Sequence, residues 1–182
     1  MIELIKKKGN INMDKSALTK LNYGLYIVST GYNDKFSACI VNTVTQITAE
    51  EKPKLIVAIN KDNYTCEIAK KSGKINISIM SQDTDMLFIG KFGFRTSKEY
   101  NKLENTKYKM GVNGIPVITE KVIGYMETKI IDVKDCNTHE LFILELEESQ
   151  ILNGEEPLTY SYYHTVIKGK TPPKASTYIG RE

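Results

Sequence analysis

Short apolar runs separated by polar turns predict a chain made mainly of β-strands. Runs of this kind, bounded by Gly, Pro, Asn or Asp, predict strands over residues 23–30, 36–48, 55–59, 75–80, 122–133 and 139–147. The last two are joined by a polar turn over 134–138 and form the clearest hairpin in the sequence. The unbroken apolar run 55–59 predicts a strand that is buried on both faces.

Helical patterns are few and short. Ser16 is placed to cap a helix over 17–21, and residues 64–71 predict a helix that ends at Ser72 and Gly73. Short helices are also predicted over 83–91 and 97–103, with 90–93 read as a loop. Many strands with few helices indicate a mainly antiparallel β-barrel, built as a single domain over residues 13–182.

The two ends of the chain differ from its middle. Amphipathic patterning begins only near Asp14, so residues 1–12 are interpreted as an N-terminal extension, with Met13 as an alternative start. A turn over 154–157 leads into the segment 158–166. The tail 168–182 is polar and rich in Pro, and it is expected to lie extended over the surface.

Composition narrows the class of protein. The chain has 182 residues, of which 41% are hydrophobic and 26% are charged, and its net charge is only +3. This charge requires neither nucleic acid nor a membrane as partner, and no window approaches the roughly 18 apolar residues needed to span a bilayer. The N-terminus does not have the order of a secretory signal, and three widely spaced cysteines fit reduced thiols, so a cytoplasmic protein is expected.

Several common motifs are absent from the sequence. There is neither a G-x-G-x-x-G fingerprint for a dinucleotide nor a phosphate-binding G-x-x-x-x-G-K-[ST] loop. Cys136 and His139 have the spacing of half a zinc site, but no second pair exists, so no metal site is predicted.

The start of the predicted helix 64–71 is a candidate phosphate site. Asn63 or Thr65 is suited to cap this helix, and the first-turn N–H groups near Tyr64 would point at an anion. Lys61 would add a positive charge two residues before Asn63. The alternative is an ordinary capped helix whose N-terminus binds only water.

The strand before it offers polar groups suited to a ring system. Asn42, Thr43, Thr45 and Gln46 carry donors and acceptors for a flavin edge or a ribityl chain, and the small side chains nearby allow a flat ring to approach. A hydroxyl-rich barrel strand without any ligand is the alternative. The predicted loop 92–97 adds Arg95 for a phosphate, although its phenylalanines are equally suited to plugging the barrel.

Several segments in this order resemble the flavin reductase-like family of FMN-binding split barrels. The resemblance covers nearly the whole chain from Met13 and is closest to the flavin reductase domain of high-molecular-weight rubredoxins. It is carried by residues 22–26, 29–30, 41–46, 59–65, 92–94, 162–164 and 168–169. The extension 1–12 has no counterpart.

The resemblance implies a homodimer that holds FMN near the subunit interface. Carried over by position, the residues around the isoalloxazine ring and ribityl chain would be Asn42, Thr43, Val44, Thr45 and Gln46. The phosphate would be held by Lys61, Asn63, Tyr64 and Thr65, with the loop residues Phe92, Arg95 and Thr96 closing over it. His139 would lie close to the flavin and the nicotinamide path, and His164 would reach toward the partner subunit, which makes both candidates for a catalytic role.

Three functions follow from these observations. The first is a flavin reductase that passes hydride from NADH or NADPH to flavin N5 and electrons on to free flavin or a redox protein such as a rubredoxin. The rubredoxin part of the multidomain relatives, with its paired C-x-x-C motifs, has no counterpart in this sequence, so the acceptor is expected to be a separate molecule. The second is a non-enzymatic FMN electron carrier, and the third is a barrel that stacks single-stranded nucleic acid on its eleven tyrosines.

Overall fold

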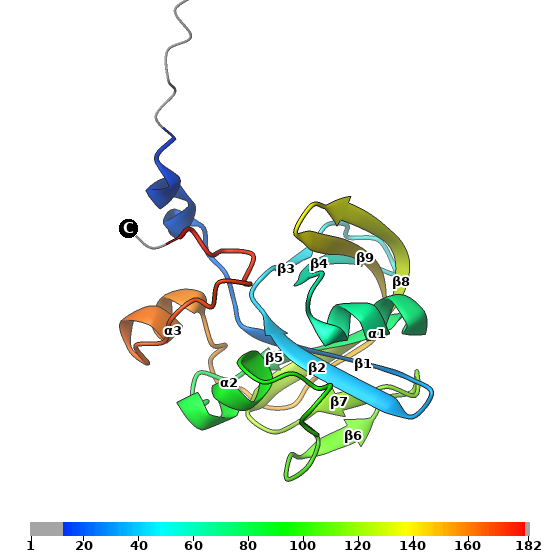
Figure 1. The fold of residues 1–182 in the computed structure, drawn as a ribbon. Coiled ribbons are helices and arrows are strands. Elements are labelled where there is room, and N and C mark those ends of the chain that lie inside the picture. The colour runs from blue at the N-terminus through cyan, green and yellow to red at the C-terminus, as the bar shows by residue number, and fades with distance from the viewer. Residues whose placement is uncertain (1–12, 181–182) are drawn as a thin grey trace, which may run out of the picture.

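The computed structural model describes residues 13–180, and a seven-stranded antiparallel sheet curled into a barrel forms its centre (Figure 1). The proposed extension 1–12 lies outside the described residues. The strands of this sheet are β1 (Tyr26–Tyr32), β2 (Lys35–Val41), β3 (Val44–Gln46), β4 (Lys54–Asn60), β5 (Lys74–Met80), β8 (Val122–Cys136) and β9 (His139–Ile151). Strands β6 (Tyr108–Met110) and β7 (Pro116–Ile118) pair separately. The predicted antiparallel barrel with few helices is confirmed.

The two edge strands of the sheet are consecutive in sequence. The spatial order is β2-β1-β5-β8-β9-β4-β3, so β2 pairs with β1 at one edge and β3 pairs with β4 at the other. The single strand predicted over 36–48 is therefore wrong, because the chain changes its pairing partner at Asn42 and Thr43. Asn42 belongs to neither strand, and its side chain forms hydrogen bonds with the hydroxyls of Ser176 and Thr177.

The hairpin of β8 and β9 is the longest pairing in the sheet. Cys136 lies opposite His139 in its register, so the turn is only Asn137 and Thr138. Asn137 has a φ of 65°, a left-handed conformation that Asn adopts more readily than most residues. The predicted hairpin is confirmed, with a shorter turn and longer strands.

Strand β4 is buried on one face only, which corrects the prediction for 55–59. Leu55, Val57 and Ile59 are buried in the core, whereas Ile56 and Ala58 are half-buried. The second face of β4 is only half-buried, although it is apolar, because Ala58 on that face borders the cavity described below.

The first two helices begin with side-chain caps. Helix η1 (Lys15–Lys20) is a 3₁₀ helix that begins after Asp14, whose carboxylate accepts from the N–H of Ser16, so the predicted cap at Ser16 is wrong. Helix α1 (Tyr64–Ser72) is confirmed, with Asn63 as its cap and the left-handed Gly73 at its end.

The segment after β5 differs most from the prediction. Helix α2 (Met86–Gly93) includes residues 90–93, which were predicted as a loop, because Phe92 packs on Phe88 with ring centroids 5.1 Å apart and is fully buried. The helix predicted over 97–103 is wrong, and this stretch is a series of turns. Local bonds oppose a helix here, since the Asn101 side chain accepts from the N–H of Leu103.

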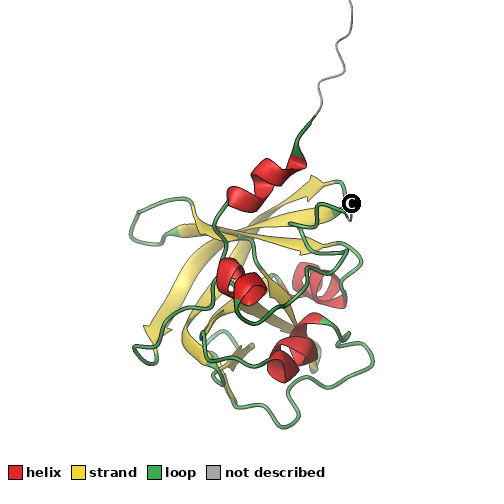
Figure 2. Cartoon of the chain, turned by 90° about the vertical axis from the view of Figure 1, so that its left-hand side faces the viewer, coloured by secondary structure: helices red, strands yellow, loops and turns green. Residues whose placement is uncertain are grey.

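The chain ends in a helix and an extended segment. Residues 158–166 contain helix α3 (Tyr160–Thr165), which Thr159 caps. The segment after it contains neither helix nor strand up to residue 180, and it passes close to β2 and β4. It is not extended throughout as predicted, because the N–H groups of Ala175 and Tyr178 each close a turn. Figure 2 shows the helices as short pieces beside the curved strands.

Candidate functional site

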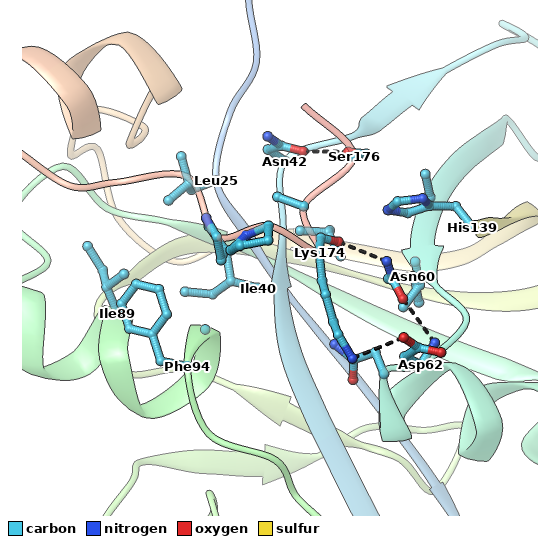
Figure 3. A pocket seen from close by; sticks show the side chains of 18 of the residues that line it. Leu25, Ile40, Asn42, Asn60, Asp62, Ile89, Phe94, His139, Lys174 and Ser176 are labelled. Atoms are coloured by element: carbon cyan, nitrogen blue, oxygen red, sulfur yellow. Dashed lines mark hydrogen bonds and ion pairs between the residues drawn. The ribbon is translucent and has the colours of Figure 1, made fainter. Parts of the chain in front are cut away.

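A cavity of about 570 Å³ opens where β2 ends, β4 ends and α1 begins (Figure 3). Part of its wall is apolar and includes Leu25, Ile40 and Ile89. The opposite part is polar, with Asn60 and His139 among its side chains. A pocket of this size with an apolar wall and a few polar groups suits a flat organic ligand with a polar end.

The cavity gathers about half of the residues predicted for the site. Those that line it are Asn42, Asn63, Tyr64, Arg95, Thr96 and His139. Those that do not line it are Thr43, Val44, Thr45, Gln46, Lys61, Thr65, Phe92 and His164.

The change of strand pairing explains why only Asn42 of the polar strand residues lines the cavity. Beyond it the chain enters β3 at the far edge of the sheet, where Thr45 and Gln46 are exposed. Thr43 lies 2.7 Å from the Ser176 hydroxyl, and Gln46 donates to the carbonyl of Thr48. An unbroken strand would have placed these residues along one line.

The start of α1 faces the cavity, but two of the residues predicted for the phosphate are engaged elsewhere. The ammonium of Lys61 lies 2.6 Å from Asp135 on β8, and this hydrogen bond lowers the pKa of the Asp135 carboxyl. Thr65 is buried, and its hydroxyl lies 2.8 Å from that of Ser37.

Asn63 takes up two N–H groups of the first turn of α1. Its side chain accepts from Thr65 N and its carbonyl from Cys66 N, at 3.0 and 2.9 Å. Among residues 13–180, the N–H of Tyr64 donates to no protein acceptor. This end of the cavity therefore offers a backbone donor and the positive end of a helix dipole.

Arg95 is held at the cavity by the turns that follow α2. Its guanidinium carbon lies 4.6 Å from the ring centroid of Tyr100. The buried Lys102 donates to the carbonyls of Ala38 and Phe92 at 2.7 and 2.8 Å, and burial lowers its pKa to about 8. These bonds fix the turns against the free edge of β2.

The two histidines lie in different surroundings. His139 is the first residue of β9 and lies opposite Asn60 of β4. Its Nδ1 lies 2.9 Å from the Thr138 hydroxyl. His139 also lines the cavity. His164 has both ring nitrogens near protein groups, with Nδ1 2.9 Å from the Gly169 carbonyl and Nε2 3.3 Å from the Thr171 hydroxyl. These contacts tie α3 to the start of the C-terminal segment, and His164 does not line the cavity.

Part of the cavity wall comes from the C-terminal segment, which the sequence reasoning missed as a site element. Residues 172–176 all line the cavity, and the carbonyl of Lys174 accepts from the Asn60 side chain at 3.2 Å. The sequence signal is Pro172–Pro173, because a proline fixes its own φ and so favours a turn, and the N–H of Ala175 donates to the carbonyl of Pro172 here.

The cavity and the barrel can be compared with known proteins. A protein-family model described as a flavin reductase like domain matches residues 18–167. The chain belongs to this flavin reductase-like family. The resemblance stated from the sequence is confirmed, and so is the predicted class of function, a flavin reductase.

Two curated relatives are similar in sequence to this chain over most of its length. A protein of Archaeoglobus fulgidus named ferric-chelate reductase (NAD(P)H) is 41% identical over 92% of this chain and 98% of its own length. High molecular weight rubredoxin of Moorella thermoacetica is 37% identical over 93% of this chain and 74% of its own length. The crystal structure of a flavin reductase domain protein from Arthrobacter sp. FB24 has a TM-score of 0.70 at 18% identity, and the match covers 80% of this chain and 87% of that one. The structural match shows the shared fold.

Residues 13–180 contain neither a metal cluster nor a membrane-spanning helix. No cluster of three or more His, Cys, Asp or Glu side chains is arranged to hold a metal ion there. Nor does any helix in this range have the length and apolar character required to cross a bilayer.

Proposed function

We propose that this chain binds FMN in the cavity and acts as a flavin reductase that uses NADH or NADPH. The observation that carries the proposal is one cavity with an apolar wall and, at its rim, the start of α1. The family supports a flavin as ligand. The name of the Archaeoglobus relative supports a reduced nicotinamide as the electron donor.

The residues of the cavity fit the parts of FMN. Ile40, Ala58 and Asn42 would lie along the ring, because they combine apolar surface with one amide. The phosphate would lie at the start of α1, where the Tyr64 N–H is available and Asn63 orders the turn. Arg95 and Thr96 would close on it from the turns after α2.

Bound FMN would supply the ring that accepts hydride from the nicotinamide and releases electrons to an acceptor. The apolar wall formed by Leu25, Ile40 and Ile89 would exclude water from one side of that ring. His139 would orient the ligand from the polar side, where its ring borders the cavity. No general acid or base is required, which suits a chain with two histidines.

The electron acceptor would be free flavin, a ferric chelate or a separate redox protein. The names of the two relatives support the last two, since one is a ferric-chelate reductase and the other a rubredoxin. We also propose a homodimer, with the cavity near the subunit interface as the family resemblance implies. The single domain over 13–182 and the cytoplasmic location are proposals that rest on the sequence.

The test is a visible spectrum followed by an activity assay. The purified chain, mixed with FMN and passed through a desalting column, is expected to keep a flavin spectrum. It should then oxidise NADH or NADPH with a rate that saturates in the nicotinamide. Retained flavin without turnover would favour the non-enzymatic carrier. A chain that keeps no flavin and instead binds single-stranded nucleic acid in a salt-dependent way would overturn both flavin functions.

A further inference from the structure

The positive charges that line the cavity are few. Over residues 13–180, the lysine and arginine side chains in its wall are Arg95 and Lys174, and Asp62 is the carboxylate in this wall. Lys61 does not contribute, because its ammonium is paired with Asp135 outside the cavity wall. A doubly charged ligand group at the start of α1 therefore meets one cation from the turns after α2 and one from the C-terminal segment.

The backbone around Lys174 is fixed on both sides. Its own carbonyl accepts from Asn60 Nδ2 at 3.2 Å, and Pro172 and Pro173 restrict the backbone before it. After it, Ser176 donates to the Asn42 side-chain oxygen at 2.9 Å. These contacts fix the backbone of Lys174 at the cavity, and Figure 3 shows its side chain running from the C-terminal segment toward Asp62.

The ammonium of Lys174 is available for exchange. It lies 3.0 Å from the Asp62 carboxylate, and the two side chains are 67% and 70% exposed. An ion pair this exposed contributes little to stability, so a ligand that carries more negative charge than one carboxylate can compete for the lysine. Asp62 directly precedes Asn63, the cap of α1, so the lysine reaches the same end of the cavity as the Tyr64 N–H.

We infer that Lys174 is a specificity-determining residue that binds the phosphate of the flavin and makes the cavity prefer FMN to riboflavin. This inference rests on the proposed function. Binding replaces the ion pair with Asp62 by a charge-assisted hydrogen bond to phosphate, which carries more negative charge than the carboxylate. Asp62 opposes binding, because its carboxylate is a like charge close to the phosphate.

The experiment compares the affinities of FMN and riboflavin, measured by flavin fluorescence titration. Lys174→Ala is expected to weaken FMN binding about tenfold and to leave riboflavin binding within about twofold. Asp62→Asn is expected to strengthen FMN binding about threefold and to leave riboflavin unchanged. Lys170→Ala is the matched control, because Lys170 is an exposed lysine of the same segment that does not line the cavity. Added salt should weaken FMN binding more steeply in the unaltered chain than in Lys174→Ala.

The outcomes separate this inference from the proposed function. If the unaltered chain binds neither flavin, the proposed function fails. If it binds both and Lys174→Ala weakens both equally, Lys174 shapes the cavity wall and does not read the phosphate, and the inference is overturned. An unchanged FMN affinity in Lys174→Ala overturns it as well.

Discussion

The hydroxyls of Ser37 and Thr65 lie 2.8 Å apart, and both residues are buried. The contact joins β2 to the first turn of α1. Neither side chain lines the cavity, but their bond holds the first turn of α1, and Asn63 and Tyr64 at the start of that helix do line it.

Replacing Thr65 by Val is expected to lower the free energy of unfolding by about 1–2 kcal/mol, because the Ser37 hydroxyl loses its buried partner while the shape is kept. Urea unfolding measures the loss. Thr45→Val is the matched control on an exposed strand position and should change stability little. An equal loss in both variants would contradict a specific role for the Ser37 contact.

Lys61→Ala is expected to change FMN affinity less than about twofold, since the lysine is paired with Asp135 and does not line the cavity. Fluorescence titration of FMN checks this, with Asp135→Asn as a second variant. A large loss of affinity in Lys61→Ala alone would restore Lys61 to the phosphate site that the sequence predicted.

Ala58→Leu is expected to weaken FMN and riboflavin together, by at least about tenfold, because the larger side chain enters the cavity from its wall. Titration of both flavins provides the measurement. Ala49→Leu, at an exposed position outside the cavity wall, serves as the control. Unchanged binding in Ala58→Leu would mean that flavin binds at another place.

Lys102 predicts a dependence of stability on pH. Burial lowers its pKa from 10.5 to about 8, so between these values the unfolded chain holds a proton that the folded chain has released. The folded state then gains stability as the pH rises through this window, by about 1.4 kcal/mol per unit from this group. Below pH 8 the lysine is charged in both states and adds no slope.

The measurement is urea unfolding of the unaltered chain and of Lys102→Met at several values between pH 8 and pH 10. The comparison removes the contribution of titrating groups that do not interact with Lys102. The unaltered chain should gain on the variant as the pH rises. A constant difference between the two curves would show that Lys102 keeps its proton.

Gly169 approaches the ring of Tyr163 so closely that an added Cβ would overlap it. Gly169→Ala is therefore expected to displace the start of the C-terminal segment and to lower the free energy of unfolding by about 1–3 kcal/mol. Gly154→Ala is the control, because open space surrounds that position. Thermal unfolding of the two variants gives the comparison, and equal midpoints would show that the segment adapts without cost.

Strands such as β5 and the β8–β9 hairpin were predicted because their apolar alternation and turn residues are local signals. Helix α1 was predicted for the same reason, with Asn63 and Gly73 at its ends. The errors lie where distant contacts decide. Residues 97–103 do not form a helix because, besides the local Asn101 bond, Ser97 and Lys102 bond the free edge of β2, and no local pattern reveals these distant contacts.

The site residues also divide into those that the sequence identified and those whose position only the tertiary structure decided. Asn42 and His139 were identified from residue type and resemblance, and both line the cavity. Lys61 and Thr65 were chosen for their closeness in sequence to the helix start, but the position of a side chain depends on its partner in space. Asp135 and Ser37, which engage them, are 74 and 28 residues away.

The sequence by itself determined the class of fold and the start of α1, because alternation, caps and turns act over a few residues. The family came from the resemblance of several segments. Only the tertiary structure decided how the cavity is built. It placed β2 and β3 at opposite edges of one sheet, paired Lys61 with Asp135 on the hairpin and brought Lys174 to Asp62 in the cavity wall. Those choices depend on hydrogen bonds and ion pairs between residues far apart in the chain, and a pattern read along the sequence does not contain them.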